Sequence, residues 1–359
     1  MTPRERQVLA IIRDEPLVSQ ADIATRLAIS RSAVAGHIMQ LTAKGAIRGR
    51  GYLLADAPAV VCVGGANVDI QGKSTQPLHD GESNPGSVSV SAGGVARNVA
   101  EHLVRQGLSC RLISAIGADA NGTFLRDHLR TVGLDPDDLQ IIPGAATPTY
   151  LSLLDSNGEL VVAVNDMQTL DALDAGLLAR KRALLEEARV LVADTNLTVE
   201  ALSFLGELAR NRPLFIDTVS AAKAGRITQL LSRVHTLKMT RTEATAISGL
   251  AISKRSQLGK LANWFRDQGV ERVFVTLGKE GVFFSDDDGD GLVDAPANGS
   301  VTAVTGAGDA FLAGLVSGWL DGISTAESIT LGQSLATDSL RHSSAVPPTV
   351  PADFVEALR

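Results

Sequence analysis

Apolar side chains recur at helical spacing in three short segments of the first 56 residues. Apolar positions lie three or four residues apart within 8–12, 23–27 and 34–41, which predicts three helices. Ser19 and Ser30 come just before the second and third segments, where a hydroxyl can cap the free backbone N–H groups of a helix. The chain therefore begins with a small helical domain.

A glycine and a short extended run follow the third segment. Gly45 precedes residues 47–54, and three short helices with this tail resemble the winged helix-turn-helix heads of small bacterial regulators. In such a head the third helix enters the major groove of DNA, and Arg48 and Arg50 on the wing would meet phosphates. We expect residues 1–56 to bind DNA; a head that only dimerises or packs on the rest of the chain is the alternative.

From residue 59 onward, short apolar runs alternate with longer amphipathic stretches. The runs typical of buried strands are 60–63, 111–115, 190–193, 214–217, 234–237 and 272–276. The helical patterns between them are 95–107, 122–132, 198–210, 255–268 and 307–320. This alternation predicts an α/β domain over residues 59–359, with a mostly parallel sheet covered by helices on both faces.

Two segments of this domain have the alternation of antiparallel strands instead. They are residues 84–91 and 147–166, and the second contains a turn signal at Asn157-Gly158. We expect lid segments near 70–91 and 147–167 to form a small β lid beside the main sheet.

Composition places the chain among folded globular proteins. It has 359 residues, of which 45% are hydrophobic and 20% charged. The start lacks an apolar stretch with a cleavage site, and no apolar run reaches the ~18 residues that span a bilayer, so we expect a cytoplasmic protein without a membrane partner. Cys62 and Cys110 each lie in an apolar run, which favours buried thiols over a disulfide scaffold.

Charge is divided unevenly along the chain. Residues 1–56 carry eight Lys/Arg against five Asp/Glu, a net of +3, and the remaining 25 Lys/Arg and 35 Asp/Glu give −10. A basic head joined to an acidic body predicts two parts with two functions. A net charge of +3 is by itself a small electrostatic signature for nucleic-acid binding.

Two motifs for phosphate or metal binding are incomplete. Gly72-Lys73-Ser74 is similar to the end of a Walker A loop, but Asn67 occupies the position of the required earlier glycine, which excludes a P-loop. The acidic run 286–291 matches the first half of a calcium loop, but its twelfth position is Ala297 where a bidentate Glu is needed. This run is more typical of a solvated hairpin turn.

The strongest signal for phosphate binding is Thr305-Gly306-Ala307-Gly308-Asp309, directly before an apolar helix. Glycines let the backbone approach a ligand closely, and N–H groups at a helix start point at an anion. Because a carboxylate would repel a bound phosphate, Asp309 suits a base that accepts a proton from an attacking hydroxyl. An ordinary helix start with an acid in its first turn is the alternative.

Asp and Asn side chains also stand beside glycine turns near the front of the body. The first strand ends in Gly64-Gly65-Ala66-Asn67-Val68-Asp69, and Gly93-Gly94-Val95-Ala96-Arg97-Asn98 opens a helix. Carboxylates and amides are groups that bind the vicinal hydroxyls of a sugar. Each glycine pair taken alone is equally compatible with a tight turn.

Paired in this order, the two glycine motifs resemble those of the ribokinase-like family of carbohydrate and nucleoside kinases. Residues 93–98 are similar to the family's early Gly-Gly-x-x-x-Asn, residues 305–309 are similar to its late Thr-Gly-Ala-Gly-Asp, and the similarity covers about residues 59–355. The resemblance implies a three-layer sandwich with a small β lid, here preceded by an all-α winged helix-turn-helix domain. A subgroup of related sugar or nucleoside kinases has the same kind of head.

Within this family the chain is most similar to the bacterial pseudouridine kinases. The segments that carry this similarity are 83–86, 150–155, 165–167, 192–196 and 235–238. The resemblance therefore implies a nucleoside, and in particular pseudouridine, as the substrate.

The resemblance also implies a role for each matched residue. Asp309 would be the general base on the 5′-hydroxyl of the substrate. The anion hole for the transferring phosphate would be formed by Gly306, Ala307 and Gly308. The ribose would be held by Asp69, Gly93, Gly94 and Asn98, with Asp166 on the lid over the nucleoside. The positions that match ATP-binding residues are Thr276, Gly278 and Thr305.

ATP and Mg²⁺ are the cofactors that the resemblance implies. Glu243 occupies the Glu of the family's Asn-x-x-Glu element, which organises magnesium and its waters, but Thr240 replaces the Asn. Ala303 stands where many members have an Asp that contacts a monovalent cation, which leaves potassium activation open. Because kinases of this family often pair through the lid, we also expect a homodimer.

These observations predict an ATP-dependent kinase that converts pseudouridine to pseudouridine 5′-phosphate. A kinase of another nucleoside or of a free pentose is the alternative among enzymes. The alternative from another class is a transcriptional regulator whose kinase-like body senses a nucleoside. The intact turn 306–309 favours the enzyme, because a sensor needs no base.

Overall fold

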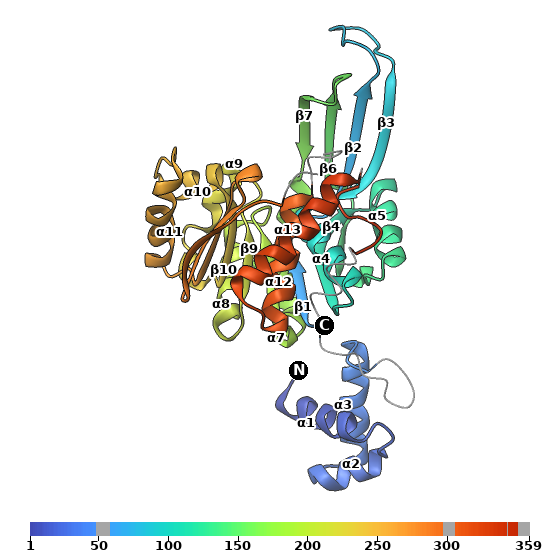
Figure 1. Cartoon of the computed structure of the whole chain (residues 1–359). Helices are drawn as coiled ribbons and strands as arrows, with labels where there is room; N and C mark the ends of the chain where they lie inside the picture. Colours follow the sequence, from blue (N-terminus) through green and yellow to red (C-terminus); the bar gives the residue numbers. More distant parts are fainter. Residues whose placement is uncertain (48–57, 297–305, 343, 351–359) are drawn as a thin grey trace. The chain divides into compact units, whose positions relative to one another are not determined.

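The chain divides into two units, Met1–Ala57 and Pro58–Arg359 (Figure 1). The computed structural model describes residues 1–47, 58–296, 306–342 and 344–350.

Each helix of the first unit begins after a hydroxyl side chain. The helices are α1 (Pro3–Asp14), α2 (Gln20–Leu27) and α3 (Arg31–Ala43). Thr2, Ser19 and Ser30 each accept a hydrogen bond from the backbone N–H three residues further on, which satisfies a donor that the helix leaves free. The predicted serine caps are confirmed.

A small apolar core holds the three helices together. Its fully buried side chains are Val8, Ile12, Ile23, Val34 and Leu41. Nearly buried Glu5 accepts hydrogen bonds from Lys44 Nζ at 2.8 Å, which ties the end of α3 to the start of α1. The predicted wing residues Arg48 and Arg50 lie outside the described residues.

The second unit is built on a nine-stranded sheet in the order β13-β12-β11-β10-β9-β8-β1-β4-β5. Its parallel strands are β1 (Val60–Val63), β4 (Cys110–Gly117), β5 (Leu139–Ile142), β8 (Val190–Asp194), β9 (Leu214–Asp217), β10 (Thr236–Thr240) and β11 (Arg272–Thr276). The antiparallel hairpin β12 (Val282–Asp286) and β13 (Gly289–Val293) completes one edge. The predicted mostly parallel sheet is confirmed.

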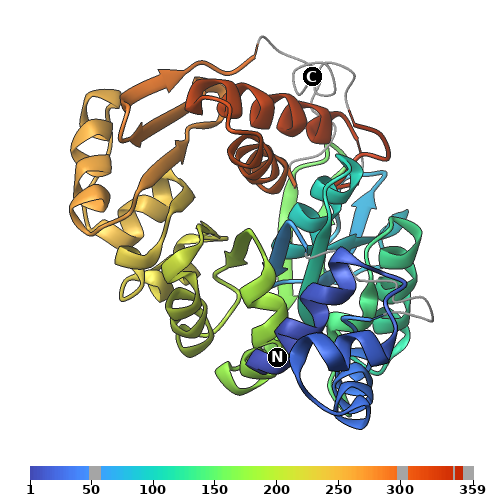
Figure 2. The ribbon, with the colours of Figure 1, turned by 90° about the horizontal axis from the view of Figure 1, so that it is seen from below.

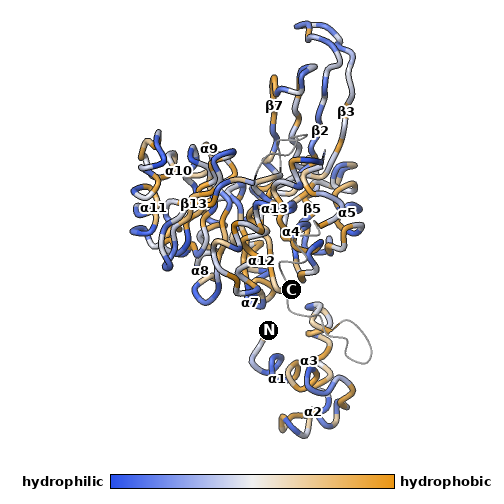
Figure 3. The backbone as a smooth tube through the Cα atoms, in the orientation of Figure 1, coloured by the Kyte–Doolittle hydropathy of each residue, from blue (hydrophilic) through white to orange (hydrophobic). Residues whose placement is uncertain are grey.

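Helices cover both faces of this sheet. Alternate residues of β1 enter two separate cores, Val61 and Val63 on one face and Val60 and Cys62 on the other. The first face carries α6 (Ala175–Arg180), α7 (Arg182–Glu187), α8 (Val199–Leu208), α10 (Arg241–Ser248) and α11 (Leu258–Asp267). The second face carries α4 (Val95–Arg105), α5 (Ala120–Thr131) and α12 (Ala307–Asp321). Hydrophobic residues accordingly gather along the sheet strands (Figure 3).

Four further strands form the small sheet that the alternating segments predict. They are β2 (Asn67–Ser74), β3 (Gly86–Gly93), β6 (Thr149–Leu154) and β7 (Leu160–Asp166), in the order β3-β2-β6-β7. Pairing is antiparallel except between β2 and β6, which are parallel. This sheet, called the lid below, projects from the rest of the unit (Figure 1).

Several predicted boundaries need correction. The strand predicted at 234–237 is β10 at Thr236–Thr240, because Val234 still closes a 3₁₀ turn over Leu231–Arg233. The helix predicted from residue 255 begins at Leu258, after a 3₁₀ turn. The strand predicted at 84–91 is β3, which begins at Gly86 and ends at Gly93.

Helix α13 (Thr325–Arg341) has no predicted counterpart. Its start signal was present in the sequence, because Ser324 and Glu327 form a capping box. Helices α12 and α13 lie side by side (Figure 2), and they approach closely where Gly314 faces the backbone of Gly332.

The two cysteines and the two incomplete motifs lie in the surroundings that the sequence predicts. Cys62 and Cys110 are both buried, with their sulfur atoms 3.8 Å apart. Gly72-Lys73-Ser74 lies inside strand β2, and the acidic run 286–291 forms the hairpin between β12 and β13. Across the described residues, the helices are all too short or too polar to cross a membrane.

A glycine-to-alanine change at the α12–α13 contact should destabilise the second unit. A Cβ at Gly314 would collide with the backbone of Gly332, so Gly314→Ala should lower the free energy of unfolding by about 1–3 kcal/mol. Gly259→Ala in α11 is the matched control, because the nearest atom to its new Cβ is 3.8 Å away, and it should stabilise by about 0.4–1 kcal/mol. Urea unfolding measures both; equal effects would contradict this packing.

Candidate active site

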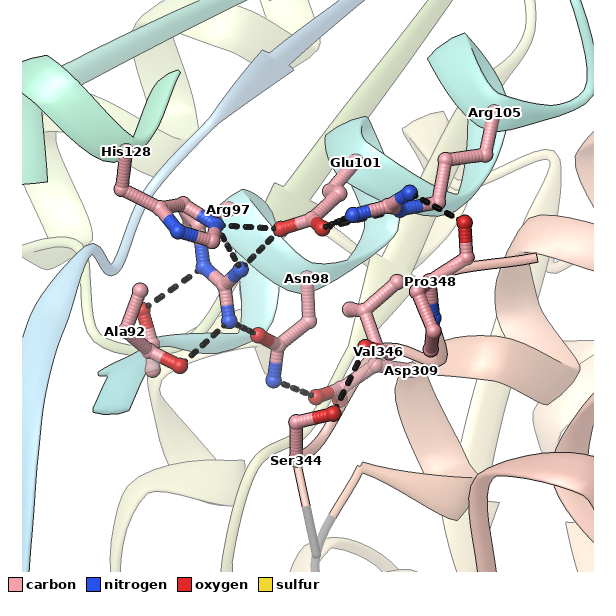
Figure 4. Close-up of polar contacts among 11 residues, drawn as sticks. Ala92, Arg97, Asn98, Glu101, Arg105, His128, Asp309, Ser344, Val346 and Pro348 are labelled. Carbon is pink, nitrogen blue, oxygen red and sulfur yellow. Dashed lines mark hydrogen bonds and ion pairs between the residues drawn. The ribbon is translucent and has the colours of Figure 1, made fainter. Parts of the chain in front are cut away.

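The two glycine motifs meet in the folded chain. Asp309 lies in the first turn of α12 and is nearly fully buried, as is Asn98 in the first turn of α4. Asn98 Nδ2 donates a hydrogen bond to Asp309 Oδ2 at 2.6 Å, although 211 positions separate the two residues (Figure 4). The residues expected to hold the ribose and the residue expected to act as base are therefore brought to one place.

The start of α12 has the backbone geometry of an anion-binding turn. Gly306 adopts φ +88° and precedes the helix, and no side chain of the described residues caps the first N–H groups of α12. A Cβ at Gly306 would press on the carbonyl of Ala345, and one at Gly308 would lie 2.7 Å from Lys238 Nζ. A side chain at Gly306 would thus require the backbone to shift, whereas one at Gly308 would require the Lys238 ammonium group to move. Thr305 lies outside the described residues.

A buried ion pair lies beneath this turn. Lys238 Nζ on β10 bonds to Asp217 Oδ2 on β9 at 2.9 Å, and both side chains are under a tenth exposed. Burial opposes the charge on Lys238, but Asp217, Asp309 and Glu243 raise the pKa of the lysine overall. Sequence reasoning assigned no role to either residue, since a lysine inside an apolar strand gives no signal of what it will face.

The surroundings of Asp309 shift its pKa strongly. Burial raises the pKa of Asp309 to about 7, and the nearby carboxylate of Asp217 adds to the rise. The hydrogen bond from Asn98 and the positive charges of Lys238 and Arg97 work in the opposite direction. A carboxyl group whose pKa lies near neutrality can accept and release a proton during turnover.

The residues expected on the sugar side line the junction of β2, β3 and α4. Asn67 Nδ2 donates to Asp69 Oδ1 at 2.5 Å, and burial raises the pKa of Asp69. A Cβ at Gly93 would collide with the Asp69 carboxylate. Gly94 adopts φ +100° and lies against the backbone of Gly65, so neither glycine tolerates a side chain.

Asp194, which sequence reasoning missed, fixes this junction from below. Its buried carboxylate accepts from the backbone N–H groups of Gly65 at 2.8 Å, Ala96 at 3.0 Å and Asn196 at 2.9 Å. One side chain at the end of β8 thereby holds both glycine turns at the front of the body. An aspartate at the end of a parallel strand was the available signal.

Asp166 lies apart from the buried cluster. It is exposed at the end of β7 and pairs with Thr149, which in turn pairs with Val68 next to Asp69. The lid register therefore carries Asp166 to the same end of the lid as Asp69, two strands away.

Two neighbouring strands, β10 and β11, end close to the next group of predicted residues. Glu243 lies in the first turn of α10, directly after β10, while Thr276 ends β11 and Gly278 follows it. Glu243 Oε2 accepts hydrogen bonds from Thr218 Oγ1 at 2.6 Å and from Thr240 N at 2.7 Å. Thr240 caps α10 in return, so the threonine in place of the family's Asn completes a capping box. Thr276 is the register partner of Thr240, and Gly278 follows with φ +60°.

A buried arginine, also missed from the sequence, organises the start of α4 (Figure 4). Arg97 donates to the carbonyl of Ala92 at 2.7 Å and of Gly93 at 3.1 Å, and also bonds to Asn98 Oδ1 and Glu101. Burial works against the charge on Glu101, but His128, Arg97 and Arg105 lower the pKa of Glu101 to about 2. The i,i+4 spacing of Arg97 and Glu101 was the only sequence signal for this pair.

Two family models match the chain. The model of the pfkB family of carbohydrate kinases matches residues 57–352, and that of a winged helix-turn-helix DNA-binding domain matches residues 1–48. With the fold described above, these matches define a kinase, that is, a phosphotransferase acting on a hydroxyl group, behind a winged helix-turn-helix head. The chain belongs to the pfkB family of carbohydrate kinases.

Relatives and solved structures agree with this assignment. The chain is 40% identical over 354 residues to the uncharacterized sugar kinase YeiI of Escherichia coli (strain K12), which covers 98% of each chain. It is 41% identical over 281 residues to the pseudouridine kinase of the same strain, covering 78% of this chain and 90% of that protein. A putative sugar kinase from Clostridium perfringens has a TM-score of 0.73 at 32% identity, over 84% of this chain and 96% of that chain.

A more distant structure supports the fold alone. The Arabidopsis thaliana ribokinase complexed with ribose and ATP has a TM-score of 0.74 at 19% identity, over 84% of this chain and 99% of that chain. The ribokinase-like fold expected from the glycine motifs is thus confirmed.

The ion pair under the phosphate turn should contribute to stability as a unit. Lys238→Met leaves Asp217 buried without its cation and should lower the free energy of unfolding by about 3–5 kcal/mol. The double variant Lys238→Met/Asp217→Asn removes both charges and should regain much of that loss. Urea unfolding of the four proteins in this cycle measures the coupling. Strictly additive losses would contradict a coupled pair.

Proposed function

We propose that this chain is an ATP-dependent kinase that phosphorylates the 5′-hydroxyl of pseudouridine, with Asp309 as the general base. The observation that carries this proposal is the hydrogen bond from Asn98 Nδ2 to Asp309 Oδ2, which joins the sugar-side turn to the phosphate-side turn. The 41% identity to a pseudouridine kinase over 281 residues supports pseudouridine as the nucleoside.

The proposed reaction requires alignment and charge neutralisation more than covalent chemistry. Asp309 accepts the proton of the substrate hydroxyl as the oxygen attacks the terminal phosphorus of ATP, and the bond from that phosphorus to the ADP oxygen breaks. The N–H groups at the start of α12 face the transferring phosphoryl group. Lys238, adjacent to Gly308, supplies a positive charge that lowers the cost of concentrating phosphate charge there.

The chain offers a partial site for magnesium. Both hydrogen bonds that the Glu243 carboxylate accepts within the described residues go to Oε2, which leaves Oε1 for a metal-bound water. No group of three or more His, Cys, Asp or Glu side chains is arranged to hold a metal within the described parts of the chain. This fits Mg²⁺, which binds through one or two carboxylates together with waters and substrate phosphates. Bound there, the metal would neutralise phosphate charge.

The nucleotide and nucleoside would lie on opposite sides of Asp309. Thr276 and Gly278, beside the Glu243 element, are proposed to contact the phosphates of ATP, as is Thr305. Asp69, Gly93, Gly94 and Asn98 are proposed to hold the ribose. Asp166, at the end of the lid nearest Asp69, would contact the nucleoside from above.

We also propose that the chain forms a homodimer through the lid. Apolar side chains on the lid strands are about half or more exposed, and every residue of β7 is exposed. These side chains are Val88, Val90, Leu151, Leu160, Val161, Val162 and Val164. Such a patch is typical of a surface that another chain covers.

Removing the proposed base should abolish most turnover. Asp309→Asn should lower kcat at least ~10²-fold while ATP still binds, because the amide cannot accept the proton. Wild-type kcat/KM should fall as the pH drops below about 7, since the carboxyl must be ionised to act as base. ADP release with pseudouridine, uridine, inosine and ribose in parallel measures activity and substrate choice.

Asp321→Asn, at the exposed C-terminal end of the same helix, is the matched control and should leave turnover unchanged. Near-normal activity of Asp309→Asn would refute the base. Preferred turnover of uridine, inosine or ribose would show that the substrate is that compound and not pseudouridine. Turnover of none of the four would favour a nucleoside-sensing regulator.

A second proposed function, DNA binding, belongs to the head. Arg31 and Ser32 are exposed in the first turn of α3, the helix that enters the major groove in domains of this class. This arrangement and the match to a winged helix-turn-helix model support a regulatory role beside the kinase activity.

Loss of Arg31 should weaken DNA binding. Arg31→Ala in the full chain should cost about 1–3 kcal/mol of binding free energy to a duplex from upstream of its own gene. Fluorescence anisotropy over a range of salt concentrations measures it. Arg13→Ala on α1 removes the same exposed charge as a control and should have little effect. Equal losses in the two variants would indicate non-specific attraction only.

A further inference from the structure

Arg97 is a buried cation with a complete set of partners at the edge of the site. Its side chain is 2% exposed, and its guanidinium reaches two backbone carbonyls, Glu101, and the side-chain oxygen of Asn98. Burying a charge costs free energy unless every donor is satisfied. The carbonyls that Arg97 bonds are those of Ala92 and Gly93, at the turn proposed to hold the ribose (Figure 4).

The bond from Arg97 decides which end of the Asn98 amide faces Asp309. A guanidinium has donors only, so the amide atom that it contacts must be Oδ1. The amide nitrogen is then left to donate to Asp309 Oδ2. With the amide turned round, Oδ1 would face the carboxylate and repel it, and the nitrogen would face the guanidinium.

The same orientation leaves Asn98 able to bind a sugar hydroxyl. An amide has two N–H donors and two lone pairs on its oxygen. Among the described residues, one donor is used on Asp309 and one lone pair on Arg97, which leaves one donor and one lone pair. A hydroxyl group, which both donates and accepts, matches that pair.

Charges around Asp309 come from three elements. Asp217 on β9 opposes ionisation of the Asp309 carboxyl, while Lys238 on β10 and Arg97 on α4 favour it. Arg97 itself faces Glu101, Asp69, Asp309 and His128. The Lys238 charge is already paired with Asp217, so Arg97 is the cation on the Asn98 side of the base.

We propose that Arg97 is a positioning residue of this kinase, which fixes the amide of Asn98 so that Asn98 holds Asp309 ionised and aimed at the substrate hydroxyl. This inference rests on the proposed function, since it assigns Asp309 as the base. Arg97 acts through Asn98 and the turn at Ala92 and Gly93, without touching the phosphoryl group.

Arg97→Met tests the proposal, because methionine fills a similar volume without charge or donors. The matched control is Arg105→Met, since Arg105 bonds the same Glu101 at 2.6 and 2.9 Å but makes no bond to Asn98. A purely structural role through Glu101 predicts equal effects of the two changes. The proposed role predicts that the titration midpoint of the Asp309 carboxyl group changes in Arg97→Met and stays the same in Arg105→Met.

Two measurements on the full chain report the ionisation of the Asp309 carboxyl group. In protein labelled with ¹³C at the aspartate carboxyl, the signal lost in Asp309→Asn identifies Asp309, and its titration midpoint should rise by about 1 pH unit or more in Arg97→Met. The acidic limb of kcat/KM should move upward by the same amount, so that activity lost at pH 7 returns partly at pH 9. KM for the acceptor should rise about tenfold or more through loss of the oriented amide.

Arg97→Lys separates charge from geometry. A lysine restores the positive charge but cannot bond Asn98 and both carbonyls at once, so it should return the titration midpoint toward wild type and leave the acceptor KM raised. If Arg97→Met does not fold, Arg97→Met/Glu101→Gln removes both buried charges and serves in its place.

The outcomes separate this inference from the proposed function. A midpoint that moves by less than about 0.3 pH unit in Arg97→Met, or equally in Arg105→Met, overturns the role of Arg97 even if Asp309→Asn is inactive. If wild type phosphorylates none of the acceptors, the proposed function fails, and the ¹³C titration still decides whether Arg97 controls Asp309.

Discussion

The hydrogen bond between Asn98 and Asp309 joins two helix starts that belong to opposite ends of the second unit's sequence. Helix α4 follows the lid strand β3, and α12 follows the edge hairpin, so this contact fixes the sugar-side turn against the phosphate-side turn. Both partners are nearly fully buried. A small displacement of either helix would separate the proposed base from the residues proposed to hold the sugar, and such displacements are costly in rate.

Charge balance explains why a carboxylate can be buried there. Asp309 and Asp217 are nearly fully buried and Asp69 is partly buried, and the buried cations Lys238 and Arg97 face them. The balance is incomplete, because burial and Asp217 still raise the pKa of Asp309 to about 7. The fold thus brings the pKa of a carboxyl group near neutrality through its surroundings, with no unusual chemistry in the side chain itself.

The two units are built by different physical means. The head depends on one small apolar core and hydroxyl caps, with a single nearly buried glutamate paired to Lys44. The second unit has apolar cores on both faces of a long sheet, and several of its buried polar side chains, among them Asp194 and Asp217, lie at the ends of parallel strands. Those strand ends are where open α/β sheets bind ligands. The family matches agree with this difference, since the head matches a DNA-binding domain and the second unit matches a carbohydrate kinase.

The sequence by itself determined the fold class and the candidate base. Apolar periodicity predicted the three helices of the head and, in the second unit, six of the seven described parallel strands and five of the helices, because these signals are local in the chain. The glycine pattern around Asp309 likewise marked a candidate phosphate turn. Strand β5 and helices α6, α7 and α10 were not predicted. Thr240 and Ser324 also had recognisable local patterns, the second of which marked a helix that was not predicted.

Only the tertiary structure decided what surrounds Asp309, the proposed base. Lys238 and Asp217 lie on separate strands, and Asp194 binds two turns that lie far from it in sequence. Arg97 reads in the sequence as one more charged residue of an amphipathic helix, and its burial depends on how α4 packs against its neighbours. Electrostatic effects depend on distance and burial in space, and neither is encoded in the local spacing of residues.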